Sequence, residues 1–497
     1  MKNGTFVRTG ATQLAAAVAL ALLASGCSLA PTYQRPVAAV APAYPAGPAY
    51  NHSGRHGATP AALTGWREFL LDSRLQQLVE LALQNNQDLR TAALNVEKVR
   101  AQYDLAHSAL LPTVGLEAGY NKANENTLAG GHTNPTRDAD VGLQVAWAPD
   151  FFGRLRSLSE VAAQQYLASA HARQAAQLLL VSQVADQYLD MLADDEQLIV
   201  TRQTLATAQT SFKLIKLQFD TGTASELDMR LSETTLELAK ANEAAQVRSR
   251  AQAENGLVLL LGQPMPFKLP PAVRLGDQPI LTDIPAGLPS DLLVRRPDIL
   301  EAEDVLRGEN ANIGAARAAF FPNITLTGLF GAGAPALGDL FGAGTKVWSF
   351  GPQLVAPLFD GGANRANLDV AKIQKDIGVA AYQKTVQTAF REVADGLAAR
   401  GTYDTQLAAL QKYTDAEQRR LDLATLRYNN GIDDYLQVLT AQTDLYNAQL
   451  QLIAARQNRL SNLVDLYRAL GGGWLEHTGT APRPADSMAS SAAQTAS

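Results

Sequence analysis

Cysteine is almost absent from this sequence: Cys27 is the only one among 497 residues. A single cysteine cannot form an internal disulfide, so no disulfide framework supports the fold. The six histidines have no second cysteine with which to build a mixed thiolate and imidazole metal site. The carboxylates of Asp194, Asp195 and Glu196 are interpreted as a solvated helix face. We therefore expect neither an enzyme nor a bound cofactor.

Long apolar runs and an excess of one charge are also lacking. After Cys27 no stretch reaches the roughly eighteen consecutive apolar residues that a membrane-spanning helix needs. Helical spans of the mature chain are therefore excluded, and any crossing of a membrane must use strands. The formal net charge is −6, and no basic tract with interleaved aromatic residues indicates a nucleic-acid partner.

The first 26 residues have the pattern of an export signal. A basic start is followed by an apolar run from Leu14 to Leu23 and by small residues directly before Cys27. The run is too short to span a bilayer, so we expect residues 1–26 to be removed. A buried free thiol inside a domain is the alternative for Cys27, but the cysteine directly follows the signal core.

Three segments have compositions that do not favour a packed core. Residues 27–62 are rich in Pro and Ala and are expected to be extended. Residues 263–290 are Pro-rich and are expected to form an irregular linker. Residues 476–497 are small and polar, and we expect a disordered tail.

The most informative stretch runs from Arg154 to Thr221. It contains no Gly and no Pro, and its apolar residues recur at three- and four-residue steps. This pattern predicts one helix of about 68 residues, roughly 100 Å long. Gly222 breaks the pattern, so we expect a reversal there and a returning helix over Glu226–Leu261.

The same pattern recurs 209 positions later. Ala363–Asn430 has no Pro and the same apolar spacing, Gly431 interrupts it, and a returning segment ends near Leu470. A duplication is therefore predicted, with repeats over 63–262 and 291–475. In each repeat a shorter helix, over 75–110 in the first and 291–320 in the second, is expected before the long one. Such helices fit a tube that crosses a compartment, and a solid coiled-coil stalk is the alternative.

Each repeat also contains two stretches with strand spacing. Residues 112–149 and 322–358 alternate apolar and polar side chains on either side of a loop, expected over 121–138 in the first and 331–345 in the second. This predicts two hairpins with strands of about 9–12 residues. Four strands cannot close a barrel, nor can they form a stable open sheet in lipid. Either the hairpins are soluble, or several chains share one barrel; three chains would supply twelve strands.

Several short motifs resemble the outer membrane factor family, which includes TolC and OprM, and most closely its NodT-type lipoprotein branch. The resemblance covers residues 62–475 and rests on Cys27 with its preceding signal, the duplication and the following segments: Leu288–Ile299 (LPSDLLVRRPDI), Ala319–Pro322 (AFFP), Phe359–Gly362 (FDGG), Tyr428–Gly431 (YNNG) and Leu470–Trp474 (LGGGW).

This resemblance implies a mainly helical fold with a small transmembrane β-barrel. Long helical hairpins would form a periplasmic α-barrel, and four strands per chain would contribute to a trimeric 12-stranded β-barrel in the outer membrane of a Gram-negative bacterium. The implied function is the exit duct of a tripartite efflux pump, with a periplasmic adaptor and an inner-membrane transporter of the resistance-nodulation-division type. Cys27 would carry N-acyl and S-diacylglycerol lipid. The alternatives are a duct for type I protein secretion and a non-conducting coiled-coil envelope lipoprotein.

The resemblance also implies a periplasmic aperture at the two helical reversals. Asp228 and Tyr428 match residues that pair with each other in the family and help to keep the aperture shut. Asp433 and Asp434 could supply an acidic ring there. The simpler alternative is that these two carboxylates cap the returning helix.

The two hairpin glycines are expected at the same turns. Gly222 and Gly431 each stand where a tight reversal favours a positive φ.

Overall fold

The computed structural model describes residues 29–38, 40–50, 59–126, 133–282, 284–285 and 289–479, and Cys27 lies outside these ranges. The chain divides into two compact units. The first contains residues 1–37, 95–169 and 301–382, and the second contains residues 38–94, 170–300 and 383–497. Among the described residues, no helix has the length and apolar content to cross a membrane.

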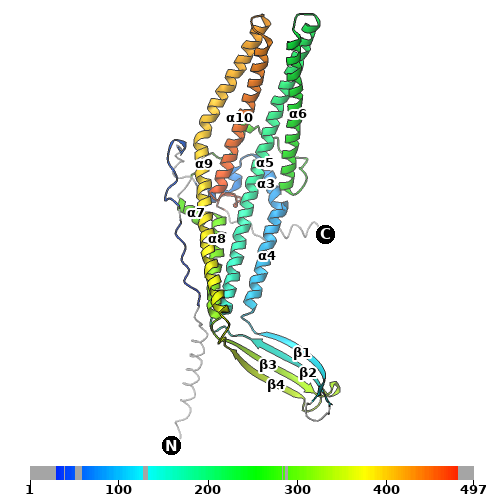
Figure 1. Ribbon diagram of the computed structural model, residues 1–497, viewed down its shortest axis with the longest axis vertical. Helices are drawn as coiled ribbons and strands as arrows, with labels where there is room; N and C mark the ends of the chain where they lie inside the picture. The colour runs from blue at the N-terminus through cyan, green and yellow to red at the C-terminus, as the bar shows by residue number, and fades with distance from the viewer. Residues whose placement is uncertain are drawn as a thin grey trace. The chain divides into compact units, whose positions relative to one another are not determined.

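The first unit contains a four-stranded antiparallel sheet in the order β1-β2-β3-β4. The strands are β1 (Thr113–Asn126), β2 (Thr133–Trp147), β3 (Asn323–Ala334) and β4 (Lys346–Val355). Pairing of β2 with β3 joins strands from the two repeats into one sheet (Figure 1). At 14 and 15 residues, β1 and β2 exceed the predicted 9–12.

The extra strand length comes from segments that the sequence assigned to loops. The predicted loop over 121–138 is largely strand, because the antiparallel register of β1 with β2 continues from Thr113↔Ala146 to Asn126↔Thr133. The predicted loop over 331–345 contains the end of β3 and the short 3-10 helix η4 (Leu337–Asp339). Polar and glycine residues hid these strand ends, since main-chain pairing does not require apolar alternation.

Four long helical segments form the two hairpins, which can be followed in Figure 1. Helices α5 (Arg154–Asp220) and α9 (Ala363–Asn429) have 67 residues each. Helix α6 (Glu226–Leu261) returns from α5, and α10 (Tyr435–Ala469) returns from α9. The observed bounds of α5, α6 and α9 lie within one residue of the sequence-based expectation.

The shorter helix that precedes the two strands of each repeat is broken once. The expected helix over 75–110 is divided into α3 (Ser73–Asn85) and α4 (Gln87–Ser108), and that over 291–320 into α7 (Pro289–Arg295) and α8 (Pro297–Ala318). At the first break the Asn86 amide donates to the Leu260 carbonyl (3.0 Å), and its Oδ1 accepts from the Leu89 N–H (2.9 Å). The second break precedes Pro297, which disfavours helical backbone at the residue before it.

The core of the second unit lies around α2 (Trp66–Phe69), α3 and the end of α10. The rings of Phe69 and Tyr467 stack at a centroid distance of 3.9 Å, and the Tyr467 hydroxyl donates to the Thr64 carbonyl (2.7 Å). The buried Asp72 caps α3 and accepts a hydrogen bond from the Tyr188 hydroxyl (3.1 Å). The short 3-10 helices η1 (Pro48–Tyr50), η2 (Ala61–Leu63) and η3 (Leu275–Asp277) complete the described elements.

In the first unit, residues 29–37 lie against α8. Arg35 forms a bidentate pair with Glu303, whose side chain is only 2% exposed, and Arg307 donates to the same carboxylate. At the end of this segment the Leu29 carbonyl accepts from Arg317 (2.9 Å). The cations offset the burial of the Glu303 charge and hold the pKa of this carboxyl below its usual value despite burial.

Candidate channel and gating sites

The two helical reversals have the same backbone chemistry. At the first turn the N–H of Gly222 donates to Phe219 (2.9 Å) and that of Thr223 to Gln218 (2.8 Å). At the second, Gly431 donates to Tyr428 (2.9 Å) and Ile432 to Arg427 (3.0 Å). These are Schellman closures. Gly222 and Gly431 have φ of 74° and 68°, so left-handed backbone, and not lack of space, favours glycine at both.

Asp228 caps α6. Its carboxylate accepts from the Ser225 hydroxyl (2.6 Å) and from the Ser225 N–H (3.3 Å), while the Asp228 N–H donates back to the hydroxyl (3.1 Å). This capping box satisfies free N–H groups at the first turn of the helix.

Tyr428 joins the two hairpins through a partner that was not expected. Its hydroxyl donates to Gln218 Oε1 (3.1 Å), which carries the contact from α9 to α5. No hydrogen bond joins it to Asp228 within the described chain, although the Asp228 charge, after burial, helps to raise the pKa of Tyr428. The Tyr428 ring lies 5.2 Å from that of Tyr435, and both belong to an apolar cluster that includes Ile215 and Val438.

The two carboxylates at the second turn have different surroundings. Asp433 forms a bidentate pair with Arg427, at 2.6 and 2.9 Å, and this guanidinium lowers the pKa of Asp433. Asp434 is the N-cap residue of α10, but its side chain makes no capping hydrogen bond. Asp434 therefore occupies the capping position that the simpler alternative predicts, but its carboxylate makes no capping hydrogen bond among the described residues.

Below the turns lies a groove of about 410 Å³ between α5, α9 and α10. Apolar and polar side chains share its lining, including Ser211, Leu214, Thr425, Tyr428 and Gln442. Sequence spacing did not identify Gln218 or Arg427 as partners. Arg427 could have been found, because only the four residues of the YNNG turn and Ile432 separate it from Asp433.

A column of carboxylates lies along α5 at four-residue spacing. Burial raises the pKa of Asp186 to about 7, with a further contribution from the Asp465 charge. Burial also raises the pKa of Asp190, which accepts from Gln457, and of Asp194, which accepts from Gln246 (3.0 Å).

The neighbouring acids of α5 are structural. Asp195 pairs with Arg250 (2.5 Å), and Glu196 accepts from the Leu275 N–H (3.0 Å). The interpretation of this stretch as merely solvated was wrong, since its carboxylates connect α5 to α6 and to η3.

The continuous register of the sheet separates two chemically different faces. One, the apolar face, carries large exposed side chains: Val114, Leu116, Tyr120, Leu143, Val145, Trp147, Phe330, Trp348, Phe350 and Leu354. The other, the polar face, carries the following residues: Glu117, Asp138, Asp140, Gln144, Thr325, Thr327, Ser349 and Gln353. Such an alternation fits strands that meet lipid on one side and water on the other.

Glycine is concentrated on the polar face, and at Gly331 the backbone of the neighbouring strand approaches closely. A Cβ built on Gly331 would lie 2.1 Å from the Val141 carbonyl oxygen, and one on Gly119 would lie 2.5 Å from Asp140 Oδ1. Gly331 therefore has no room for a larger residue in this arrangement of the strands, whereas at Gly119 the Asp140 side chain would have to move.

A family model described as outer membrane efflux protein matches residues 78–263 and 288–472. The toluene efflux pump outer membrane protein TtgC of Pseudomonas putida is 45% identical over 468 residues, which cover 94% of this chain and 96% of that protein. The outer membrane protein OprJ of Pseudomonas aeruginosa is 42% identical over 464 residues, covering 93% and 96%.

Among solved structures, the open state of the MtrE outer membrane channel of Neisseria gonorrhoeae matches with a TM-score of 0.81 and 39% identity. The match covers 91% of this chain and 100% of that structure. The helical hairpins and the four-stranded sheet are thus found together in a known outer-membrane channel.

Proposed function

The chain belongs to the outer membrane efflux protein family, and from that membership we propose that three copies form one duct. Proteins of this family are the outer-membrane exit ducts of efflux pumps, and this is the function of the chain. The proposed assembly is a trimeric 12-stranded β-barrel continuous with a periplasmic α-barrel built from the helical hairpins.

The observation that carries the assembly is the strand order of the sheet. Because β2 pairs with β3, the sheet of one chain has two edge strands, β1 and β4. Unpaired main-chain groups are very unfavourable in hydrocarbon, at several kcal/mol for each group. Pairing β1 of one copy with β4 of the next would remove every edge when three copies close the ring.

The two faces of the sheet indicate which side of the proposed barrel faces outward and which faces inward. The apolar face would meet lipid, and the polar face would line a watery lumen. The glycines of the polar face favour this choice, because the inner side of a closed sheet is the more crowded one.

The cargo is proposed to be small toxic compounds such as drugs or solvents. The name of the 45% identical TtgC refers to toluene efflux. Partners would be a periplasmic adaptor at the helical reversals and an inner-membrane transporter of the resistance-nodulation-division type.

Lipid on Cys27 would attach the chain to the same membrane. Leu29, two positions after this cysteine, is held by Arg317 near the end of α8, and β3 begins five residues beyond Ala318. Leu29 thus lies near the start of a strand, which supports the proposal that an acyl chain carried two residues earlier would enter the bilayer.

The test is the mass of the full chain purified in detergent. A species of three chains supports the shared barrel, and intact-mass analysis of the denatured chain should show the added acyl and diacylglycerol groups. A chain that is monomeric in every detergent would refute the proposal of a shared barrel. Such a result would favour a non-conducting envelope tether, for which planar bilayers should record no current.

A further inference from the structure

Cations gather at one end of the apolar face of the sheet. This end, called the hairpin end, is where β1 passes to β2 and β3 passes to β4. Lys122 of β1 stands directly opposite Arg137 of β2, and Lys346 of β4 stands opposite Ala332 of β3. Their register places all three on the face that carries Tyr120 and Trp348, and all three are exposed. Like charges directly opposite one another are unfavourable, so an anion bound between Lys122 and Arg137 would be stabilising.

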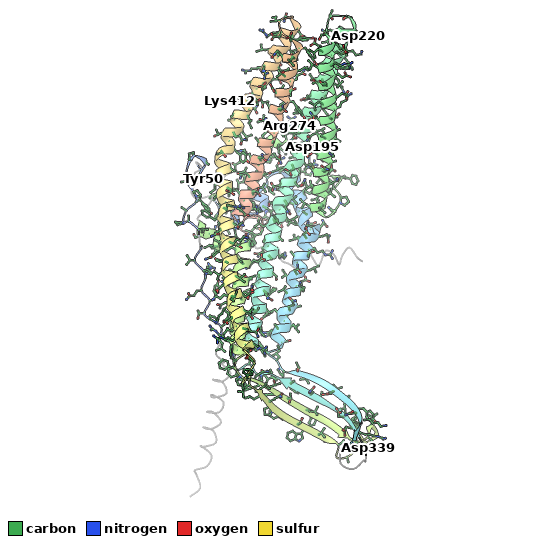
Figure 2. All side chains as sticks on the ribbon, in the orientation of Figure 1. Tyr50, Asp195, Asp220, Arg274, Asp339 and Lys412 are labelled. Carbon is green, nitrogen blue, oxygen red and sulfur yellow. The ribbon has the colours of Figure 1, made fainter. Side chains whose placement is uncertain are left out.

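Acidic groups of the sheet do not neutralise this cluster. Glu117, Asp138 and Asp140 belong to the opposite, polar face by the same register. No ion pair joins any of the three cations to a carboxylate among the described side chains. The nearest acid in sequence to Lys346 is the exposed Asp339 of η4, which Figure 2 shows at the hairpin end.

The connection between β3 and β4 adds apolar groups at the same end. Leu340 is buried against Ala139 and Ala334 of the apolar face. Its neighbours Leu337 and Phe341 are 65% and 85% exposed. A short loop held by one leucine therefore exposes two large apolar side chains beside a cluster of cations. In water, both apolar side chains would be solvated.

Exposed apolar side chains next to unpaired cations fit the boundary between acyl chains and phosphate groups. We propose that the hairpin end of the apolar face binds the phosphate groups of anionic lipid. Lys122, Arg137 and Lys346 contact the headgroup, while Leu337 and Phe341 enter the acyl region. This inference rests on the proposed function, because the sheet must lie in a bilayer for the site to meet lipid.

The experiment uses the tryptophans of the apolar face as reporters. Trp348 is 77% exposed and lies two residues from Lys346. The full-length trimer would be placed in phosphatidylcholine vesicles that contain either brominated phosphatidylglycerol or brominated phosphatidylcholine, and quenching of its fluorescence would be compared. The variant Trp348→Phe identifies the part of the signal that arises at the site.

The wild-type protein should prefer the brominated anionic lipid, by roughly 5-fold for each cation. The triple variant Lys122→Gln, Arg137→Gln, Lys346→Gln should lose this preference, and a variant that exchanges Lys and Arg at the three positions should keep it. Lys372→Gln removes one cation from α9, away from the sheet, and should change nothing.

Equal quenching by the two lipids in a conducting wild-type trimer would overturn the inference and leave the proposed function intact. An unchanged preference in the triple variant would overturn it as well. If the protein forms no trimer and carries no current, the proposed function fails, and the lipid site fails with it.

Discussion

At the residue scale, Tyr428 shows how one hydroxyl can link two long hairpins. The tyrosine was expected at the aperture from its motif, but its partner Gln218 lies 210 positions away in sequence. Nothing in the local pattern of α5 distinguishes this glutamine from the other polar residues of the helix. Only the fold brings the end of α5 beside the end of α9.

We propose that the hydrogen bond between Tyr428 and Gln218 helps to keep shut an aperture at the helical reversals, so Tyr428→Phe is expected to loosen it. The substitution removes one hydrogen bond of about 1 kcal/mol per chain, while the ring and its apolar neighbours remain packed. We expect single-channel recordings to show a higher open probability, by roughly 5-fold for each hydrogen bond removed. Tyr413→Phe is the matched control, since this hydroxyl has no hydrogen bond among the described residues. An open probability equal to that of wild type would show that the Tyr428 hydroxyl does not restrain the aperture.

Asp228→Ala is a less specific test of the same aperture. It also removes the capping box, which costs about 1 kcal/mol at the start of α6. Ser225→Ala removes part of the cap and leaves the Asp228 charge in place. A difference between these two variants therefore reports the contribution of the charge.

Asp186 predicts a dependence of stability on pH. Its pKa is raised to about 7, above the ordinary 3.8, so the folded protein holds a proton that the unfolded chain releases. The contribution to stability is complete below about pH 4 and is lost as pH rises through 7, by roughly 2–4 kcal/mol in all. Asp186→Asn should make the melting temperature less dependent on pH between pH 4 and pH 7, and should raise it at pH 7. Asp415→Asn, on the exposed part of α9, is the control; an unchanged pH profile in Asp186→Asn would refute the assignment.

At the scale of elements, the long helices could be bounded from the sequence but the breaks in the shorter ones could not. Gly222 and Gly431 interrupt apolar periodicity, and a positive φ at a glycine is a local property. The break at Asn86 depends on the Leu260 carbonyl of another helix. The break at Arg296 could have been inferred from Pro297, because a proline restricts its predecessor.

Arg296 gives the LPSDLLVRRPDI segment a structural role. The buried guanidinium pairs with Asp298 (2.6 Å) and Glu392 (2.9 Å) and donates to the carbonyl of Ala469 at the end of α10. It thus connects the α7–α8 break to two long helices.

Arg296→Ala should lower the free energy of unfolding by about 3–5 kcal/mol, because the carboxylates lose a buried partner. Urea denaturation followed by circular dichroism measures the loss. Arg295→Ala is the neighbouring control and should cost less than about 1 kcal/mol. Equal effects of the two substitutions would contradict this role of Arg296.

At the scale of the whole molecule, the sequence supplied the repeat, the hairpins and the number of strands. It did not supply the register that extends β1 and β2 into polar residues, since Asn121 and Asp138 carry no apolar alternation. The pairing of β2 with β3 was equally hidden, because it joins segments about 190 residues apart.

The proposed ring predicts hydrogen exchange at the sheet edges. In a closed barrel the amides of β1 and β4 should exchange as slowly as those of β2 and β3, because neighbouring copies supply their partners. Hydrogen exchange with mass spectrometry on the detergent-solubilised trimer measures this. Fast exchange confined to β1 and β4 would show an open sheet. Slow exchange in the dissociated monomer would show that protection does not come from the ring.

The two helical reversals are similar in backbone but different in charge. One carries the Ser225–Asp228 cap, and the other carries the Arg427–Asp433 pair. In a ring of three chains the reversals would alternate, so the approximate sixfold symmetry of the main chain would be reduced to threefold by the side chains. A protein that docks on this ring can therefore distinguish neighbouring positions, and six identical copies of it would meet two different surfaces.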